Sequence, residues 1–327
     1  ISYGKEKPLD PAHNEEASIG DVIQRIPRSV YGCNVKVIVI DDGSTDRTAL
    51  VAEQSGADLV TRVGIRRGLA RAFAIGLDRA LESGADLVVN IDADGQYDPE
   101  EIPKVIKPIL AGEADVVLGS RFAGRIEHMS LGKKAGNRIA TILTSRLAGI
   151  TISDAQTGFR AFSREAAMKL NIIADYTYVQ EMLIQAAEKG LRIVEVPINF
   201  RKRAHGESRL IRSLFGYASR AGLTMLRTYR DYRPLATFMT IGVILFLSGI
   251  VVGFRVLVHY LETGQVSPYI PSAILTAILV ILGFQAIFLG LVADMFRGIR
   301  FLLEETLYLI RSRNPPSKSP PQQADGH

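Results

Sequence analysis

Residues 88–96 read Val-Val-Asn-Ile-Asp-Ala-Asp-Gly-Gln, and this stretch gives the first indication of both the fold and the site. An apolar run typical of a buried strand ends in two carboxylates, Asp92 and Asp94, one residue apart. Residues i and i+2 of a strand point to the same side, so both side chains can reach one cation. Two carboxylates with open coordination positions suit Mg²⁺ or Mn²⁺ shared with a substrate phosphate. A solvated turn is the alternative interpretation.

Strand and helix patterns alternate around this stretch. Residues 35–40 and 115–120 are apolar runs of strand type, and residues 68–81 have apolar positions at helical spacing. This alternation predicts an α/β fold, Rossmann-like, with a mostly parallel sheet and helices on both faces. Ligands of such sheets bind beyond the carboxyl ends of the strands, where we expect Asp42, Asp92, Asp94 and Arg121. The chain has neither a Gly-x-Gly-x-x-Gly nor a Walker lysine motif, which disfavours dinucleotide and P-loop sites.

Two further segments, 235–258 and 272–293, are almost wholly apolar. They explain why the chain is 47% hydrophobic with a mean hydropathy of +0.14, values that are high for a purely soluble protein. Each is long enough to cross a bilayer core of about 30 Å, and two buried core helices are the alternative. We therefore predict a multi-pass membrane protein with two spans.

Basic residues flank these predicted spans. The loop at 262–265 has no Lys or Arg, and positive flanks stay in the cytoplasm, so we expect the domain before the spans and both termini there. The single cysteine, Cys33, excludes an intrachain disulfide and fits a reducing compartment. The first ten residues are polar, and we expect no signal peptide among them. The flanking arginines are Arg220, Arg227, Arg230, Arg233, Arg297, Arg300, Arg311 and Arg313.

The net charge of +5 and the pI near 9.3 agree with a membrane and phosphate partner. Nucleic acid is not expected as a partner, because no nucleic-acid-binding module is recognisable. We divide the chain into a cytosolic domain (1–209), an amphipathic interfacial helix (210–234), two transmembrane helices with a short external loop (235–293), and a basic juxtamembrane helix with a disordered tail (294–327).

Six short motifs, in their order, resemble the family 2 inverting glycosyltransferases, and within them the dolichyl-phosphate mannose synthase branch, which acts on polyprenyl phosphates. They are Pro-Ala-His-Asn-Glu (11–15), Asp-Asp-Gly-Ser-Thr-Asp (41–46), Asp-Ala-Asp-Gly-Gln (92–96), Gly-Ser-Arg (119–121), Thr-Gly-Phe-Arg (157–160) and Gly-Glu-Ser-Arg (206–209).

The resemblance implies a GT-A type nucleotide-sugar-binding fold and a set of site residues. It implies catalytic roles for Asp94 and Arg121, and a metal site for Mg²⁺ or Mn²⁺ at Asp92, Asp94 and Gln96. Acceptor phosphate binding would fall to Arg121, Lys133 and Asn137. The nucleotide sugar would be bound by Pro11, Ala12, Glu15, Asp42, Asp92, Ala93, Asp94, Arg203 and Arg209.

The implied reaction is metal-dependent inverting transfer of a hexose from a nucleotide-diphosphate sugar to a polyprenyl (dolichyl) phosphate, with GDP-mannose favoured over a UDP-sugar. A phosphate acceptor is largely a dianion at pH 7, so it needs no general base, and catalysis would rest on positioning and charge stabilisation. Simpler roles stay open: Asp42 as a helix cap, Arg121 as a salt-bridge partner, and Lys133 as a solvated or lipid-contacting residue.

Other functions are open alternatives. A processive polysaccharide synthase needs a Gln-x-x-Arg-Trp motif, and this chain has no Trp. A membrane-tethered nucleotidyltransferase would need a Gly-rich phosphate loop. A non-catalytic nucleotide-sugar-binding scaffold subunit is the alternative from another class. Association of the two spans with further copies of the chain is a hypothesis.

The sequence departs from the family pattern at its start. In the family an apolar strand leads directly into the first motif, whereas residues 5–10 here read Lys-Glu-Lys-Pro-Leu-Asp. Pro8 has no N–H to donate to a strand ladder, so this stretch predicts a poor strand. His13 also stands where an aromatic residue is frequent, and we give it no catalytic role.

Overall fold

The computed structural model describes residues 15–64, 68–172, 178–202, 230 and 233–313. The chain forms two compact units, residues 1–225 with 306–327 and residues 226–305. Some predictions lie outside the described residues. They concern the first ten residues, the interfacial helix expected over 210–234 apart from Arg230, Arg233 and Pro234, and the tail from Asn314 onward.

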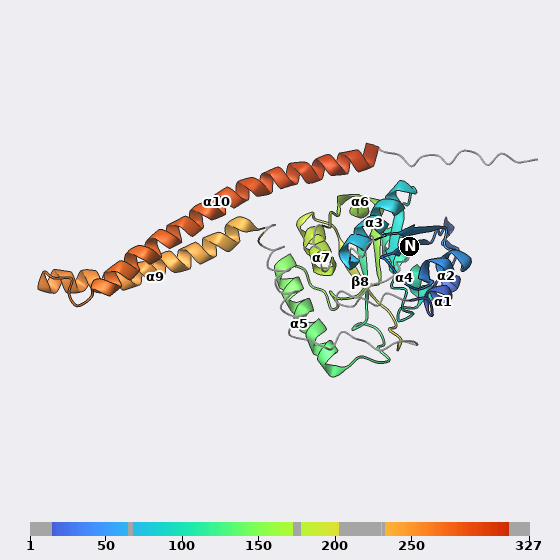
Figure 1. The fold of residues 1–327 in the computed structure, drawn as a ribbon, viewed down its shortest axis with the longest axis horizontal. Helices are drawn as coiled ribbons and strands as arrows, with labels where there is room; N and C mark the ends of the chain where they lie inside the picture. The colour runs from blue at the N-terminus through green and yellow to red at the C-terminus, as the bar shows by residue number, and fades with distance from the viewer. Residues whose placement is uncertain (1–14, 65–67, 173–177, 203–229, 231–232, 314–327) are drawn as a thin grey trace, which may run out of the picture. The chain divides into compact units, whose positions relative to one another are not determined.

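Helices and strands alternate in the first unit in the predicted order (Figure 1). The strands are β1 (Ser29–Val30), β2 (Cys33–Asn34), β3 (Ile38–Asp41), β4 (Leu59–Arg62), β5 (Leu87–Asn90), β6 (Val116–Ser120), β7 (Arg160–Ser163) and β8 (Ile193–Pro197). The helices are α1 (Ile19–Arg25), α2 (Thr48–Gln54), α3 (Leu69–Glu82), the 3₁₀ turn η1 (Pro99–Glu101), α4 (Ile102–Leu110), α5 (Leu131–Ala148), α6 (Arg164–Lys169) and α7 (Val179–Glu188).

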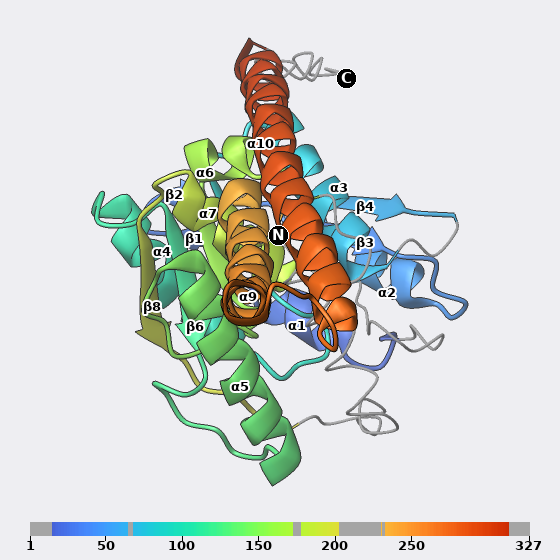
Figure 2. The same cartoon turned by 90° about the vertical axis from the view of Figure 1, so that its left-hand side faces the viewer.

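Four strands form a mixed sheet in the order β5-β7-β6-β8, and β3 pairs with β4 in parallel. Strand β7 is antiparallel to both β5 and β6, so β5 and β6 run in the same direction, and β8 is parallel to β6. Figure 2 shows β3 and β4 to the right and β6 and β8 to the left. The predicted α/β fold is confirmed, and the carboxyl ends of β5, β6 and β8 meet at one edge.

Two layers of apolar side chains cover the faces of the strands. Helices α3, α6 and α7 pack on one face, and α1, α2 and α4 pack on the other (Figure 1). Because both faces are covered, β5 and β6 carry buried apolar residues on both sides, as at Val88, Val89 and residues 116–118. Strands β4 and β8 are only partly buried, as expected of edge strands.

Local turns decide where β3 and α1 begin. Strand β3 begins at Ile38 rather than at residue 35, because residues 29–34 form the β1–β2 hairpin and the Val35 N–H donates to the Arg28 carbonyl. The first helix begins at Ile19, since Ser18 and Ile19 both donate to the Glu15 carbonyl in a preceding turn.

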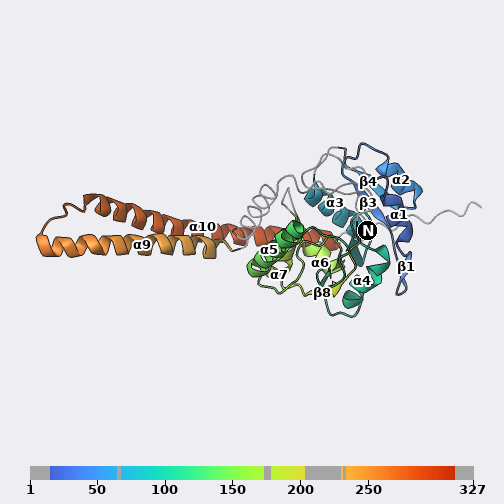
Figure 3. The same ribbon diagram turned by 90° about the horizontal axis from the view of Figure 1, so that it is seen from below.

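The second unit contains α9 (Pro234–Thr263) and most of α10 (Ile270–Arg313), which run side by side (Figures 1 and 3). Both helices are long and apolar enough to cross a membrane, and only 17% and 11% of their most apolar windows are buried. The alternative of two buried core helices therefore does not describe them, and side chains this apolar and exposed fit a lipid environment.

Glycines allow α9 and α10 to approach closely. A Cβ at Gly242 would lie 2.8 Å from the Gly283 carbonyl oxygen, and a Cβ at Gly283 would lie 2.6 Å from the Phe246 nitrogen. In lipid, helix association depends on such close packing, because lipid tails are as apolar as the side chains.

The residues of α10 from Thr306 onward belong to the first unit. There Arg311 donates to the carbonyls of Met168 and Leu170 and to the side chains of Asn171 and Asp78, at 2.8–3.1 Å. The end of α10 is thus fixed to helices α3 and α6 by one guanidinium.

Gly242→Leu should loosen the α9–α10 pair, because its side chain would meet backbone atoms that cannot move aside. We expect a loss of about 1–3 kcal/mol in stability in detergent, measured by circular dichroism during SDS-induced unfolding. Gly298→Leu is the matched control, since a Cβ there meets no atom within 4 Å. Equal losses in both variants would contradict the close packing at Gly242.

Candidate active site

Charged side chains follow three strands at their carboxyl ends, as predicted. Asp42 follows β3, Asp92 and Asp94 follow β5, and Arg121 follows β6. Because β5 and β6 run in the same direction, Asp92, Asp94 and Arg121 emerge at the same edge of the sheet. This is the edge at which open α/β sheets bind ligands.

Asp92 lies directly against Gly158 of the loop that precedes β7. A Cβ at Gly158 would lie 2.4 Å from Oδ2 of Asp92 and 2.8 Å from Oδ1. No side chain fits in that space, so the glycine of the Thr-Gly-Phe-Arg motif is what lets the carboxylate occupy its place. The Gly158 carbonyl also accepts a 2.6 Å hydrogen bond from the Asn90 amide at the end of β5.

Asp94 sits in a tight turn. Its Oδ1 accepts the Gln96 N–H at 3.0 Å, and Gly95 between them has a φ of +73°, which favours glycine. The Gln96 side chain donates its amide nitrogen to the Arg201 carbonyl at 3.4 Å. This bond uses the amide nitrogen of Gln96, which cannot bind a metal. The amide oxygen is the atom that would act as the predicted metal ligand.

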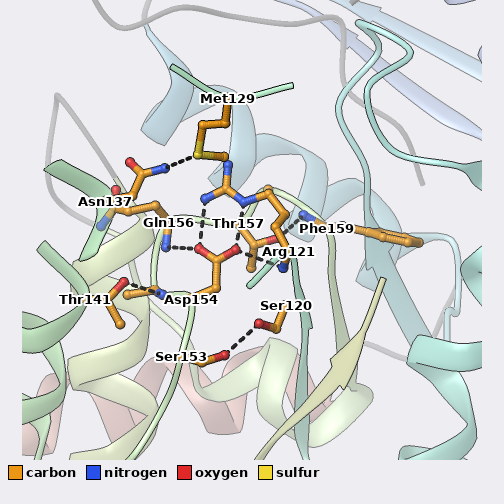
Figure 4. A network of polar contacts seen from close by, with 12 residues as sticks. Ser120, Arg121, Met129, Asn137, Thr141, Ser153, Asp154, Gln156, Thr157 and Phe159 are labelled. Atoms are coloured by element: carbon orange, nitrogen blue, oxygen red, sulfur yellow. Dashed lines mark hydrogen bonds and ion pairs between the residues drawn. The ribbon is translucent and has the colours of Figure 1, made fainter. Parts of the chain in front are cut away.

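Arg121 is held by Asp154 in a buried ion pair (Figure 4). The Asp154 carboxylate accepts Nε at 2.7 Å, Nη2 at 2.8 Å and the Arg121 backbone N–H at 3.0 Å. Burial alone would lower the pKa of Arg121, but the neighbouring Tyr97 and the hydrogen-bonded Asp154 raise it above its ordinary value. Arg121 is therefore a fixed cation, and Asp154 leaves its Nη1 edge for another acceptor.

The loop that carries Asp154 is tied to the elements around it. Glu195 of β8 accepts the backbone N–H groups of Ser153 and Asp154 at 2.7 and 2.9 Å. Thr141 of α5 accepts the Ala155 N–H at 3.0 Å, and the hydroxyls of Ser120 and Ser153 share a 2.6 Å bond (Figure 4). The carboxylate that holds Arg121 is consequently fixed from three sides.

Tyr97 and Arg160 complete the buried polar centre. The Tyr97 hydroxyl accepts the Gly158 N–H at 2.8 Å, and burial raises the pKa of Tyr97 to about 12, so the phenol stays neutral at physiological pH. Arg160 is fully buried and donates to the carbonyls of Ala155 and Thr157 at 2.9 Å. Burial lowers the pKa of Arg160. Together these two side chains fix both ends of the loop that presents Gly158.

Two predicted nucleotide residues make contacts inside the protein. Asp42 accepts the N–H of Gly68, the residue that precedes α3, at 2.8 Å, and the N-cap residue of the next helix, α2, is Arg47. Glu15 donates its backbone N–H to Thr48 at 3.1 Å and accepts the Ser18 hydroxyl at 3.0 Å. Their nucleotide-binding roles remain predictions.

The predicted acceptor residues other than Arg121 lie on α5. Lys133 and Asn137 are half-buried, and the Asn137 amide points to the Met129 sulfur at 3.9 Å, beside Arg121 (Figure 4). Ala93 is fully buried behind the Asp92–Asp94 turn. Four further predicted residues, Pro11, Ala12, Arg203 and Arg209, lie outside the described residues.

The sequence analysis missed four residues that build this centre: Tyr97, Asp154, Gly158 and Arg160. Two of them belong to the Thr-Gly-Phe-Arg motif, to which no role was given. Asp154 precedes that motif by three residues and has no signature of its own, because its partner Arg121 is distant in the chain. The one usable indication was that a buried Arg121 needs a carboxylate partner, and Asp154 is that partner.

Comparison with known proteins agrees with this architecture. The family model "Glycosyl transferase family 2" matches residues 11–170, and the model "Glycosyltransferase family 2 C-terminal transmembrane region" matches residues 215–297. The UDP-N-acetylglucosamine–dolichyl-phosphate N-acetylglucosaminyltransferase of Methanococcus voltae is 31% identical over 66% of this chain and 94% of its own length. The chain belongs to glycosyltransferase family 2.

Two further relatives extend the comparison. The dolichol-phosphate mannosyltransferase of Pyrococcus furiosus is 31% identical over 78% of this chain and 72% of its own length. Glucosyl-3-phosphoglycerate synthase from Mycobacterium tuberculosis, solved with Mn²⁺, UDP and phosphoglyceric acid, superposes with a TM-score of 0.53 and 28% identity, over 66% of this chain and 75% of that one. This chain is thus a glycosyltransferase with a GT-A-like fold.

Solved relatives with Mn²⁺ and UDP support divalent metal dependence in general, and the side chains here fit such an ion. Among the described residues no group of three or more His, Cys, Asp or Glu side chains gathers around one point. Asp92 and Asp94 instead offer two hard oxygen donors, which suits an ion whose remaining ligands come from a diphosphate and water.

Gly158→Ala should displace the Asp92 carboxylate, because the new methyl group would overlap its oxygens. We expect the affinity for Mn²⁺ in the presence of a nucleoside diphosphate to fall by about 10- to 100-fold, measured by electron paramagnetic resonance. Gly136→Ala, where a Cβ meets no atom within 4 Å, is the control. Unchanged Mn²⁺ affinity in Gly158→Ala would show that this contact does not position Asp92.

Asp154→Asn should leave the buried Arg121 cation without its counter-charge. We expect a loss of about 3–5 kcal/mol in the free energy of unfolding, measured by chemical denaturation in detergent. Asp115→Asn removes the partner of the exposed Arg192 instead, and should cost about 1 kcal/mol or less. Similar losses in the two variants would show that the buried Arg121–Asp154 pair stabilises the fold no more than the exposed Arg192–Asp115 pair does.

Proposed function

We propose that this chain transfers a hexose, with inversion, from a nucleotide-diphosphate sugar to a polyprenyl phosphate at the cytosolic face of a membrane. GDP-mannose is the donor we favour, and a UDP-sugar is the alternative. Relatives named for transfer to dolichyl or polyprenyl phosphate support this acceptor class.

The observation that carries the proposal is the pairing of opposite charges at one sheet edge. The carboxylates of Asp92 and Asp94 leave the end of β5, and the fixed Arg121 cation leaves the end of β6. A donor diphosphate, through a shared cation, suits the first group, and an acceptor phosphate suits the second.

The residues of the chain would act mainly by positioning. Arg121, oriented by Asp154, would present its Nη1 edge to the acceptor phosphate, and Lys133 and Asn137, four residues apart on α5, would assist it. A phosphate dianion needs no base to attack the anomeric carbon, so orientation and charge stabilisation suffice. Attack in line with the leaving diphosphate inverts the anomeric centre.

Asp92 and Asp94 would hold Mg²⁺ or Mn²⁺, with Gln96 beside them. A bound divalent cation would act as a Lewis acid that neutralises the charge of the leaving diphosphate. The protein contributes the fixed geometry: Gly158 leaves room for Asp92, and the turn at Gly95 directs Asp94.

The membrane arrangement follows from the two apolar helices and their charged flanks. Arg230 and Arg233 precede α9, and Arg297, Arg300 and Arg311 lie in the later part of α10, whereas the connecting residues 264–269 have no Lys or Arg. By the positive-inside rule both ends of this pair, and with them the catalytic domain, would face the cytoplasm.

Transfer of radiolabelled sugar into an organic-extractable lipid would test the proposal. Membranes with the full chain would receive dolichyl phosphate, Mg²⁺ or Mn²⁺, and a panel of GDP- and UDP-sugars. We expect label in the lipid phase from one donor, reduced about a hundredfold or more in Asp94→Ala. Glu113→Gln, an exposed carboxylate outside the site, is the matched control and should keep full activity.

Absence of label from every donor, with nucleotide still bound by the folded protein, would contradict the proposal. It would favour the non-catalytic scaffold subunit. Growth of a labelled glycan on the lipid beyond one sugar would instead favour a polysaccharide synthase.

A further inference from the structure

A cavity of about 400 Å³ lies between the beginning of α9 and the later part of α10. All the residues that line it fall within 226–305, so the second unit forms it alone. The residues of the candidate active site are not among them. The cavity is therefore a separate feature of the helix pair.

The cavity forms where the close packing of the two helices ends. Within the pair, a Cβ at Gly249 would lie 2.9 Å from the side chain of Val280. A Cβ at Gly290 would likewise lie 2.9 Å from the Cβ of Phe238. Gly298 is the next glycine of α10, and a Cβ there would meet no atom within 4 Å. Beyond Gly290 the helices thus lack the glycine contacts that bring them together, and space is left between them.

Three guanidinium groups give the cavity its charge. Arg230 precedes α9, and Arg297 and Arg300 lie on α10. The described residues that line the cavity include no Asp or Glu. Arg300 also donates its Nε to Glu304 at 3.0 Å, and the group remains net positive when this carboxylate is counted. Such a cavity attracts an anion, and the planar fork of arginine is suited to a phosphate in particular.

Apolar surface makes up the rest of the lining. Phe238 and Phe296 contribute aromatic rings, and Pro234 is the first residue of α9. A water-soluble anion gains little from such surface, whereas an amphiphile can place its phosphate on the arginines and its chains against the rings. The volume is within the usual range of sites for small molecules.

The arginines also lie at the depth of a membrane where phosphates are found. Arg230 stands just before the apolar segment 235–258, and Arg297 stands just after the apolar segment 272–293. Basic residues at the ends of membrane spans lie at the level of the lipid headgroups. Basic pockets between transmembrane helices at this level are typical sites for anionic lipids.

We propose that this cavity binds one anionic phospholipid of the bilayer, with its phosphate on Arg230, Arg297 and Arg300 and the first part of its chains against Phe238 and Phe296. The bilayer supplies this lipid directly to the two helices. The residues predicted to bind the acceptor phosphate all belong to the first unit, which favours a phospholipid over the polyprenyl phosphate here. By bridging the residues before α9 and those of α10, the lipid would stabilise the end of the pair that lacks glycine contacts.

Native mass spectrometry of the full chain in detergent would test the proposal, with phosphatidylglycerol as the anionic probe and phosphatidylcholine as the neutral one. We expect phosphatidylglycerol to bind at least about tenfold more tightly. Arg297→Gln should weaken it about fivefold, and Arg297→Gln together with Arg230→Gln about 25-fold, because each basic residue near a headgroup contributes about fivefold. Both side chains are exposed, so the fold does not depend on burying them.

Arg255→Gln is the matched control, since it removes a positive charge from α9 at a residue that does not line the cavity. It should leave the affinity for phosphatidylglycerol unchanged. Equal binding of the two lipids, or the same loss in Arg255→Gln as in Arg297→Gln, would overturn the proposal.

Two competitors distinguish the phospholipid from other phosphates. Glycerol 3-phosphate has a phosphate headgroup without chains and should not displace phosphatidylglycerol; displacement would show that the arginines bind any phosphate ester and would overturn the proposal. Displacement by an equal concentration of dolichyl phosphate would assign the cavity to the acceptor lipid and would overturn it as well. None of these measurements follows sugar transfer, so their outcome is independent of the proposed reaction.

Discussion

The buried ion pair between Arg121 and Asp154 is the interaction on which the rest of the site depends. Removing both charges from water is costly, and the cost is offset only if nearly every donor and acceptor is satisfied. The protein meets this demand by tying the Asp154 loop to β8 through Glu195 and to α5 through Thr141. The strand, the loop and the helix around the site are therefore held in one arrangement by the requirements of one pair of charges.

A second constraint acts on the same loop from its other end. Gly158 must lie against Asp92, so the loop cannot move outward without losing the contact that places this carboxylate. The buried guanidinium of Arg160 secures that position by binding main-chain carbonyls within the loop, which no neutral side chain of similar size could satisfy at once. Asp92 and Arg121 come from different strands, yet their separation is fixed by a single short segment between Asp154 and Arg160.

The sequence was informative where the pattern was local. Continuous apolar runs identified β5 and β6, and the carboxylates that follow them were correctly expected at the edge of the sheet. The antiparallel strand β7, the β1–β2 hairpin and the partner of Arg121 were not predicted, because each depends on contacts between segments that are distant in the chain. Asp154 and Glu195 show the reason: nothing in their immediate neighbours distinguishes them from surface carboxylates, and only the folded arrangement makes them indispensable. The motif around Gly158 was recognised, but its purpose becomes visible only beside Asp92.

The neutrality of the Arg121–Asp154 pair bears on how an acceptor phosphate would be bound. As a unit the pair carries no net charge, so it attracts a dianion from a distance only weakly. Attraction would then come from the basic face of α5, where Lys133, Lys134 and Arg138 lie together, whereas Arg121 would act at short range through a rigid, correctly oriented edge. In the proposed reaction, these basic side chains of α5 would attract the acceptor, and Arg121 would orient it. A lysine at position 121 could not replace the arginine, because it would lose the two-point bond to Asp154 that fixes the direction of the third donor group.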